Sequence, residues 1–545
     1  MVGSRLNRGM VALAALGWCC CINAASAAVP DTATALPAEQ EALHVLNRLS
    51  FGPAPGELDR VMHMGVAAYI DEQLHPERLS DPPQLRQRLQ ALHTQQLSAV
   101  DLYAEFGPPA RQAAGKDQAA LDQVNRRQNQ VADETRQARL LRAIYSPAQL
   151  QEVMVDFWYN HFNVFIDKDQ EDRIWAGAYE REAIRPYALG RFRQLLGATA
   201  EHPAMLYYLD NWQSSVVTTD KNGKTHGGLN ENFAREVMEL HTLGVNGGYS
   251  QKDVTELARI LTGWTYVPRQ LAAHQGPAFH FELKNHDYGS KTFLGQAFPA
   301  GGGVEEGERA LDMLAASPAT ARHLATELAQ YFVADQPPPA LVKRLAQRFE
   351  QTHGDIRETL AALFASPEFR DPKFYGGKFK TPYQYAVSSL RVSGLPMIVN
   401  VRPLLDTLYQ NGQPLYGCLT PDGYKNTREA WLNPDTMIYR LNFANALGNG
   451  YLPLWQPPQV NPPPPPAPAP AMQGMDGKAV PAPMVVSMAP PKPAAPAPKP
   501  QPPDPFVVQA ALGNAFSLVT AEALAAARPP LRTGLMLGSP EFMGR

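Results

Sequence analysis

Five imidazole and carboxylate side chains from separate parts of the chain are of the types that hold a metal ion. Such ligands suit zinc, iron or manganese. The candidate ligands are His161, Glu236, His241, His286 and Asp287. In this hypothesis Glu239 or Glu231 acts as the base on a metal-bound water. If the segments converge, the sequence predicts a metal-dependent hydrolase.

The same residues also allow a purely structural interpretation. There is no HExxH motif, and the candidates include no ligand pair one helical turn apart and no cysteine cluster. In this interpretation His161 is a core histidine bonded to a backbone carbonyl, Glu236 pairs with a cation such as Arg235, and His286 and Asp287 shape a turn. The mutual distance of His161, His241 and His286 distinguishes the two interpretations.

Two helices and a β-turn must position these groups. Residues 230–244 predict a helix with an apolar face that Glu236 and His241 flank, ended by Gly244. A second helix is expected to start at a capping box of Ser146 and Gln149, with His161 continuing its buried face. Ser250 with Asp253 predicts another capping box. Residues 116–143 are polar and predict an exposed helix or crossover.

Strand signals are sparse. Residues 279–282 and 291–294 predict a short hairpin, with His286 and Asp287 in its turn. The expected fold class is therefore mainly α: a large multi-helix domain with a small β-hairpin appendage and a disordered Pro-rich insertion.

The first 27 residues predict a secretory signal peptide. Arg5 and Arg8 precede an apolar run over residues 10–22, and small residues lead to a cleavage site after Ala27. The run is too short to span a membrane, and no transmembrane segment is expected after cleavage. A lipoprotein anchor is rejected because the bulky Trp18 precedes Cys19. The predicted location is the periplasm or the medium, and the one remaining cysteine, Cys418, predicts a structural thiol.

The rest of the chain divides at its Pro-rich segment. Residues 28–456 predict the main helical domain, and residues 457–505 hold 20 of the 51 prolines, which predicts a disordered spacer. Residues 506–545 are apolar again and too few to fold alone, so they are expected to pack back on the main domain. A net charge of -3 and a pI near 6.5 argue against nucleic-acid binding.

Several segments resemble one known set of bacterial sequences. They are FWYNHF (157–162), HPAMLYYLDN (202–211), NENFAREVMELHTLG (230–244), VNGGYSQKDVTELARILTGWT (245–265), HDYGSKTFLG (286–295) and WLNPDTMIYRLNF (431–443). In this order they resemble the bacterial domain of unknown function 1800 family over residues 40–450 and the final SPEF segment. The resemblance implies a large exported bacterial protein and carries over no catalytic role.

The resemblance also implies a partner. Genes of this family often lie beside those of the domain of unknown function 1501 family, which is similar to sulfatases and alkaline phosphatases. The leading hypothesis is therefore an exported helical scaffold or partner protein that acts in envelope or extracellular-polymer handling. The metal-dependent hydrolase is the alternative.

Overall fold

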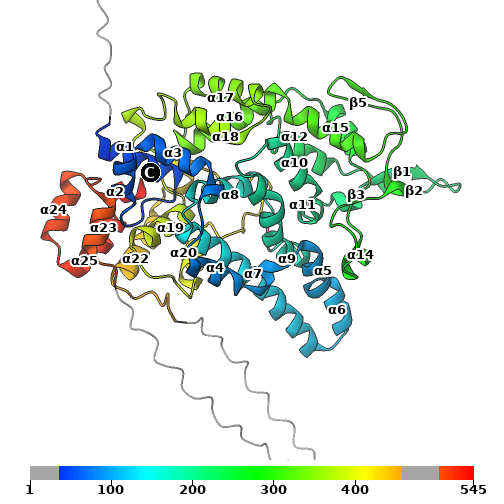
Figure 1. Cartoon of the computed structure of the whole chain (residues 1–545). Coiled ribbons are helices and arrows are strands. Elements are labelled where there is room, and N and C mark those ends of the chain that lie inside the picture. The colour runs from blue at the N-terminus through cyan, green and yellow to red at the C-terminus, as the bar shows by residue number, and fades with distance from the viewer. Residues whose placement is uncertain (1–35, 457–501) are drawn as a thin grey trace, which may run out of the picture. The chain divides into compact units, whose positions relative to one another are not determined.

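The computed structural model describes residues 36–456 and 502–545, and this part of the chain is mainly helical with small two-stranded antiparallel sheets (Figure 1). The fold class expected from the sequence is thus confirmed. The expected signal peptide and residues 457–501 of the Pro-rich segment lie outside the described residues. Within them, no helix is both long enough and apolar enough to cross a membrane.

The helices before residue 280 are α1 (Ala38–Leu49), α2 (Glu57–Met64), α3 (Val66–Leu74), α4 (Pro83–Gln90), α5 (Ala99–Phe106), α6 (Pro108–Ala114), α7 (Gln118–Tyr145), α8 (Gln149–His161), α9 (Gln170–Tyr179), α10 (Phe192–Glu201), α11 (Pro203–Tyr208), α12 (Glu231–Glu239), α13 (Gln251–Ile260) and α14 (Pro268–Ala272). Those after it are α15 (Val304–Ala315), α16 (Pro318–Phe332), α17 (Pro339–Gln351), α18 (Ile356–Phe364), α19 (Pro382–Val392), α20 (Arg402–Gln410), α21 (Arg428–Trp431), α22 (Pro434–Gly448), α23 (Pro505–Leu512), α24 (Leu518–Ala526), α25 (Pro529–Leu537) and α26 (Pro540–Met543).

The strands and short helical turns are brief. The strands are β1 (Ser215–Thr219), β2 (Thr225–Gly228), β3 (Trp264–Thr265), β4 (His280–Phe281), β5 (Lys291–Phe293) and β6 (Gln296–Phe298). One turn, η3 (Glu180–Ile184), is π-helical. The 3₁₀ turns are η1 (Pro76–Arg78), η2 (His93–Gln96), η4 (Arg185–Tyr187), η5 (Asn211–Gln213), η6 (Leu283–Asn285) and η7 (Pro372–Phe374).

The helix starts follow local capping chemistry, with one correction. Ser250 and Asp253 form the expected capping box of α13. The expected capping box at Ser146 is wrong, because α8 begins only at Gln149, whose amide side chain donates to the carbonyls of Ala143 and Ser146. The polar helix α7 is exposed at its start but buries its last turns, including Arg139.

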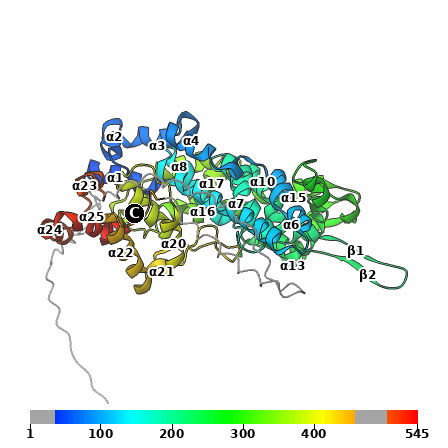
Figure 2. The ribbon, with the colours of Figure 1, turned by 90° about the horizontal axis from the view of Figure 1, so that it is seen from below.

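The hairpin expected over residues 279–294 is also wrong. Strand β4 pairs with β3, and β5 pairs with β6. The turn between β5 and β6 is Leu294–Gly295, and both residues have positive φ, at 47° and 75°. Two consecutive positive φ angles make the tight turn that suits a two-residue hairpin, so β5 finds its partner locally. A further hairpin, β1–β2, projects from the body in both ribbon views (Figures 1 and 2).

The C-terminal helices lie against helices from both the N-terminal part and the later part of the main domain. Helix α25 packs along α22, and α23 contacts α2 and α19. The Tyr385 hydroxyl donates to the carbonyls of Arg440 and Leu537, which joins α19, α22 and α25. In Figure 1 these red helices lie beside the blue N-terminal ones. These contacts let residues 506–545 bury apolar side chains that they could not bury by themselves.

Gly307 gives a test of the packing between α15 and β3. A methyl group at Gly307 would lie 2.1 Å from the ring of Trp264, a fully buried side chain. We expect Gly307→Ala to lower the free energy of unfolding by about 1–3 kcal/mol, the usual cost of overpacking. Urea unfolding followed by circular dichroism measures this. The control is Gly228→Ala, where the added methyl meets nothing within 4 Å. Equal stability of the two variants would contradict the packing described.

Candidate metal centre and adjoining cavity

A histidine at the end of α8 meets a histidine and a glutamate of α16. His323 and Glu327 are four residues apart and therefore share one face of α16. His161 is the last residue of α8. Each of the three offers a ligand atom within 4.8 Å of the other two, and among the residues that the structure describes they are the one group of three or more His, Cys, Asp or Glu that meets this criterion. Two imidazoles and a carboxylate form a common ligand set for zinc and iron.

Both nitrogens of His161 face oxygen acceptors. Its Nδ1 lies 2.8 Å from Glu327 Oε2, and its Nε2 lies 3.2 Å from the carbonyl oxygen of His241. A neutral imidazole has only one N–H, so it donates to only one of these oxygens. One nitrogen of a neutral His161 therefore faces an oxygen without an N–H to donate, and a cation held between His161 and Glu327 would satisfy both side chains.

The second imidazole, His323, faces the other oxygen of the same carboxylate. His323 Nε2 lies 3.2 Å from the carbonyl oxygen of Leu240 and 3.6 Å from Glu327 Oε1. The two oxygens of one carboxylate thus face two different imidazoles. Burial opposes the ionisation of Glu327, but His161, His323 and Lys425 outweigh it and hold the pKa of Glu327 below its ordinary value.

His241 lies directly behind this group. Its ring centroid is 6.2 Å from that of His161, and its buried Nε2 has no hydrogen-bond partner in the described part of the chain. Burial, with His161 and His323 nearby, lowers the pKa of His241 well below its ordinary value, so this imidazole is neutral. A neutral ring close to the others adds no repulsion to a cation held by them.

The three side chains lie in the wall of a cavity of about 390 Å³. Tyrosines and amide side chains form much of the remaining wall: Tyr159, Asn160, Asn163, Gln330, Tyr331, Tyr383, Gln384, Gln413, Tyr416, Tyr424 and Asn426. Aromatic faces and amide hydrogen-bonding groups around a concave site are typical of small-molecule binding. The cavity is large enough for a ligand of about one sugar unit or somewhat more.

A buried charge network borders the cavity. Arg139 pairs with Asp156 at 2.5 Å and with Glu180 at 3.1 Å, and its guanidinium lies over the Tyr416 ring at 5.0 Å. Glu180 also accepts from Arg185 at 2.9 Å and from the Tyr416 hydroxyl at 2.6 Å. Burial raises the pKa of Asp156, although Arg139 opposes this.

The candidate ligands from the hairpin region lie in another cluster. His286 Nε2 is 3.3 Å from Glu306, which also pairs with Lys291 at 2.6 Å. Asp287 is 2.8 Å from Arg259. The neighbours of His286 and Asp287 are thus local, and neither residue belongs to the group of His161. The structure therefore brings His161 and His241 together and gives His286 and Asp287 different neighbours.

The three candidate carboxylates of α12 differ in their surroundings. Glu231 accepts from Gln251 and Thr255, and Glu239 pairs with Arg235 at 3.4 Å. Burial and then Glu239 and Asp422 raise the pKa of Glu236, although Arg235 opposes this. None of the three belongs to the group of His161, His323 and Glu327 in the described part of the chain. Their role as ligand or base stays a prediction.

The sequence reasoning missed His323 and Glu327. They form an HxxxE pair in a stretch whose apolar residues repeat at helical spacing, which is a usable signal for two ligands on one face. Cys418 is a buried free thiol whose pKa is raised, chiefly by burial, in keeping with the expected structural role.

Comparison with known sequences shows the class of protein. The sequence pattern of the family described as "Protein of unknown function (DUF1800)" matches residues 44–544. The chain therefore belongs to the DUF1800 family, as the resemblance predicts. No curated protein and no solved structure matches the chain.

Proposed function

We propose that the protein is a metal-dependent hydrolase that holds a divalent cation between His161, His323 and Glu327. The observation that carries this proposal is their convergence in the wall of a 390 Å³ cavity. The cation is zinc, iron or manganese, because imidazole and carboxylate together suit these ions. This set revises the one expected from the sequence and keeps His161 as the shared member.

The surrounding residues support this chemistry. When bound, such a metal lowers the pKa of a coordinated water and supplies a nucleophile. The carbonyl of His241 accepts from Nε2 of His161, whose Nδ1 faces Glu327, and a hydrogen bond of this kind orients a ligand ring. Asp156, with its raised pKa, is the cavity carboxyl best suited to give a proton to a leaving group.

The cavity wall favours a polar, hydroxyl-bearing substrate. Tyrosine faces suit the apolar side of a sugar ring, and the amides suit its hydroxyl groups. We therefore propose a unit of an extracellular or envelope polymer as the substrate. The N-terminal segment expected to direct export is consistent with this choice.

The test is the metal content of protein purified without chelators. We expect about one equivalent of metal per chain by mass spectrometry of the elements, and a loss of at least about tenfold in affinity in His323→Ala and Glu327→Gln. Metal content should also fall as the pH is lowered, because protons compete with the metal for the imidazole and carboxylate ligands.

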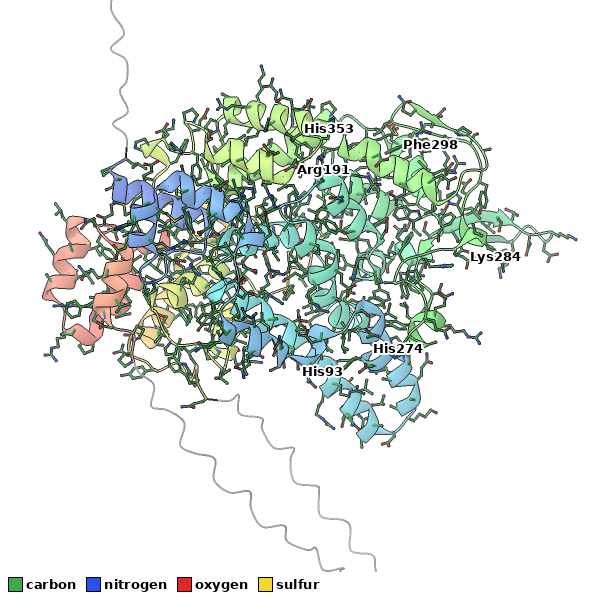
Figure 3. All side chains as sticks on the ribbon, in the orientation of Figure 1. His93, Arg191, His274, Lys284, Phe298 and His353 are labelled. Atoms are coloured by element: carbon green, nitrogen blue, oxygen red, sulfur yellow. The ribbon has the colours of Figure 1, made fainter. Side chains whose placement is uncertain are left out.

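Two controls sharpen this test. His93→Ala removes an exposed imidazole of the N-terminal helices, labelled in Figure 3, and should leave the metal in place. His286→Asn distinguishes between the two ligand sets, because this variant loses the metal only if the set expected from the sequence is correct. Metal-free wild-type protein, or full metal retention by His323→Ala, would refute the proposed centre.

The scaffold or partner role remains the second proposal. Exposed large apolar side chains, a common feature of interaction surfaces, occur on α22, α24 and α25. They include Ile438, Leu441, Leu518, Val519 and Leu531. A sulfatase-like protein of the domain of unknown function 1501 family is the proposed partner. Co-purification from native envelope extract should return that protein, and a Leu518→Asp, Val519→Asp variant should not retain it.

A further inference from the structure

A second cavity lies where the end of the chain pairs with the segment before α19. Residues 378–380 and 543–545 run antiparallel: Lys378 and Arg545 exchange backbone hydrogen bonds, and Lys380 N donates to Met543 O. This pairing places the Lys380 and Arg545 side chains in the wall of one cavity of about 320 Å³. His44 from α1 lines the same cavity.

The surroundings of this cavity are rich in buried cations. Lys380 and Arg545 are in the wall itself, and Arg48, Lys378 and Arg440 lie near them. Lys378 pairs with Asp335. Among the residues that the structure describes, the other four form no ion pair, although buried charges are normally paired. Asp335 and Asp156 lie near Arg48 and Arg545 without pairing with them, so the cluster holds more cations than carboxylates.

The cavity wall offers polar groups that have no partner among residues 36–456 and 502–545. Lys380 Nζ donates to Ser388 Oγ at 2.9 Å and lies 3.9 Å from the centre of the Phe542 ring, which leaves it further donors. Arg545 donates from Nη2 to the Tyr331 carbonyl, while its buried Nε has no partner. The buried Nδ1 of His44 also has none.

His44 is an acceptor toward this cavity. Burial and the nearby Arg48 lower the pKa of His44 to about 3, so the ring is neutral. Its Nε2 lies 2.8 Å from the carbonyl oxygen of Phe369 and must carry the proton to donate there. Nδ1 then presents a lone pair. The wall thus combines two cationic donors with one acceptor.

We propose that this cavity binds a phosphate group that still carries one proton, with Lys380 and Arg545 holding its oxygens and His44 Nδ1 accepting its hydroxyl. Hydrogen phosphate matches both the donors and the acceptor, whereas sulfate has no hydroxyl at neutral pH. The one acidic side chain of the wall, Glu541, is held by Ser517 N and the Thr520 hydroxyl. The proposal stands independently of the metal centre.

The protonation of Lys380 supports the choice of an anion. Burial, with Arg545 and Arg440 nearby, lowers the pKa of Lys380 to about 7. A bound anion favours the charged ammonium, so binding above pH 7 takes up a proton. Sulfate keeps its charge between pH 6 and 9, and its weaker binding should therefore weaken further over that range.

Titration calorimetry of the full chain with inorganic phosphate tests the proposal. We expect saturable binding, tighter than that of sulfate, and at least about tenfold weaker phosphate binding in Lys380→Met, since charge-assisted contacts are the strong ones. His44→Phe should abolish the preference for phosphate over sulfate. Glycerol phosphate in place of phosphate shows whether the group is recognised free or as part of an organic ester.

The controls separate folding and the metal centre from binding. Lys373→Met removes an exposed lysine and should bind phosphate as the wild type does. If Lys380→Met does not fold by circular dichroism, Arg545→Met, whose backbone pairing is retained, replaces it. Glu327→Gln should lose metal but keep phosphate binding. No phosphate binding to the wild type, or unchanged binding in the folded variants of Lys380 and Arg545, would overturn the proposal.

Discussion

Replacement of Glu180 by Gln is expected to lower the free energy of unfolding by about 3–5 kcal/mol, the cost of breaking a buried ion pair from one side. Glu180 is buried and accepts from Arg139, Arg185 and the Tyr416 hydroxyl. Burial opposes its ionisation, but Arg139 and Arg185 outweigh burial and lower the pKa of Glu180 to about 2. The neutral amide leaves both guanidinium groups short of negative charge.

Urea unfolding at pH 7 measures this effect. The control is Glu77→Gln, which breaks an exposed pair with Arg357 and should change stability by less than about 1 kcal/mol. The depressed pKa fixes the sign of the pH dependence: the stabilisation is complete above the ordinary value of 4.5 and is lost as the pH falls toward 2. The difference between wild type and Glu180→Gln should therefore shrink below pH 4.5. A constant difference would contradict the network.

Replacement of Trp158 by Ala is expected to cost about 3–5 kcal/mol through the cavity that it leaves. Trp158 is fully buried in α8, and its Nε1 donates to the Ala188 carbonyl at 3.0 Å. Its ring packs against Phe162 and Phe192, with centroids 6.0 and 5.9 Å away, and edge-on against His161 at 5.4 Å. The substitution thus removes packing from beside the candidate metal centre.

The matched variant is Trp158→Phe, which keeps most of the ring volume but leaves the Ala188 carbonyl without its donor. It should cost about 1–3 kcal/mol, less than the alanine variant. Denaturant midpoints at constant slope give both values. Equal losses would mean that the hydrogen bond, and not the packing, fixes Trp158 in the core.

Local signals predict much of this fold. Apolar residues at helical spacing and cap residues such as Ser250 act within one turn, so the sequence alone reveals most helices. The mainly helical class follows from them. Strand pairing is less local. Residues 279–282 suit a strand, but β4 pairs with β3, where Trp264 lies opposite Phe281, 17 positions later in the chain, and no periodicity identifies that partner. A two-residue turn at Leu294–Gly295 decides the pairing of β5.

The candidate centre was only partly predictable for the same reason. His161 continues an apolar face and is therefore expected to be buried. Its partners lie on α16. Glu327 is 166 positions further along the chain, so no local pattern predicts that contact. His286 looked equally suitable by residue type, but Glu306, from a helix that follows it, lies beside it instead. Residue type indicates which side chains could be ligands, but only the tertiary structure shows which of them lie together.

Helix α16 carries more than the metal ligands. His323, Glu327 and Tyr331 succeed one another at four-residue spacing, and Tyr331 both lines the first cavity and accepts from Arg545 of the second. A segment of α16 about two turns long therefore connects the candidate metal centre with the second cavity. The phenotype of a substitution at Tyr331 has to be assigned by measuring both metal binding and phosphate binding, since this residue contacts both sites.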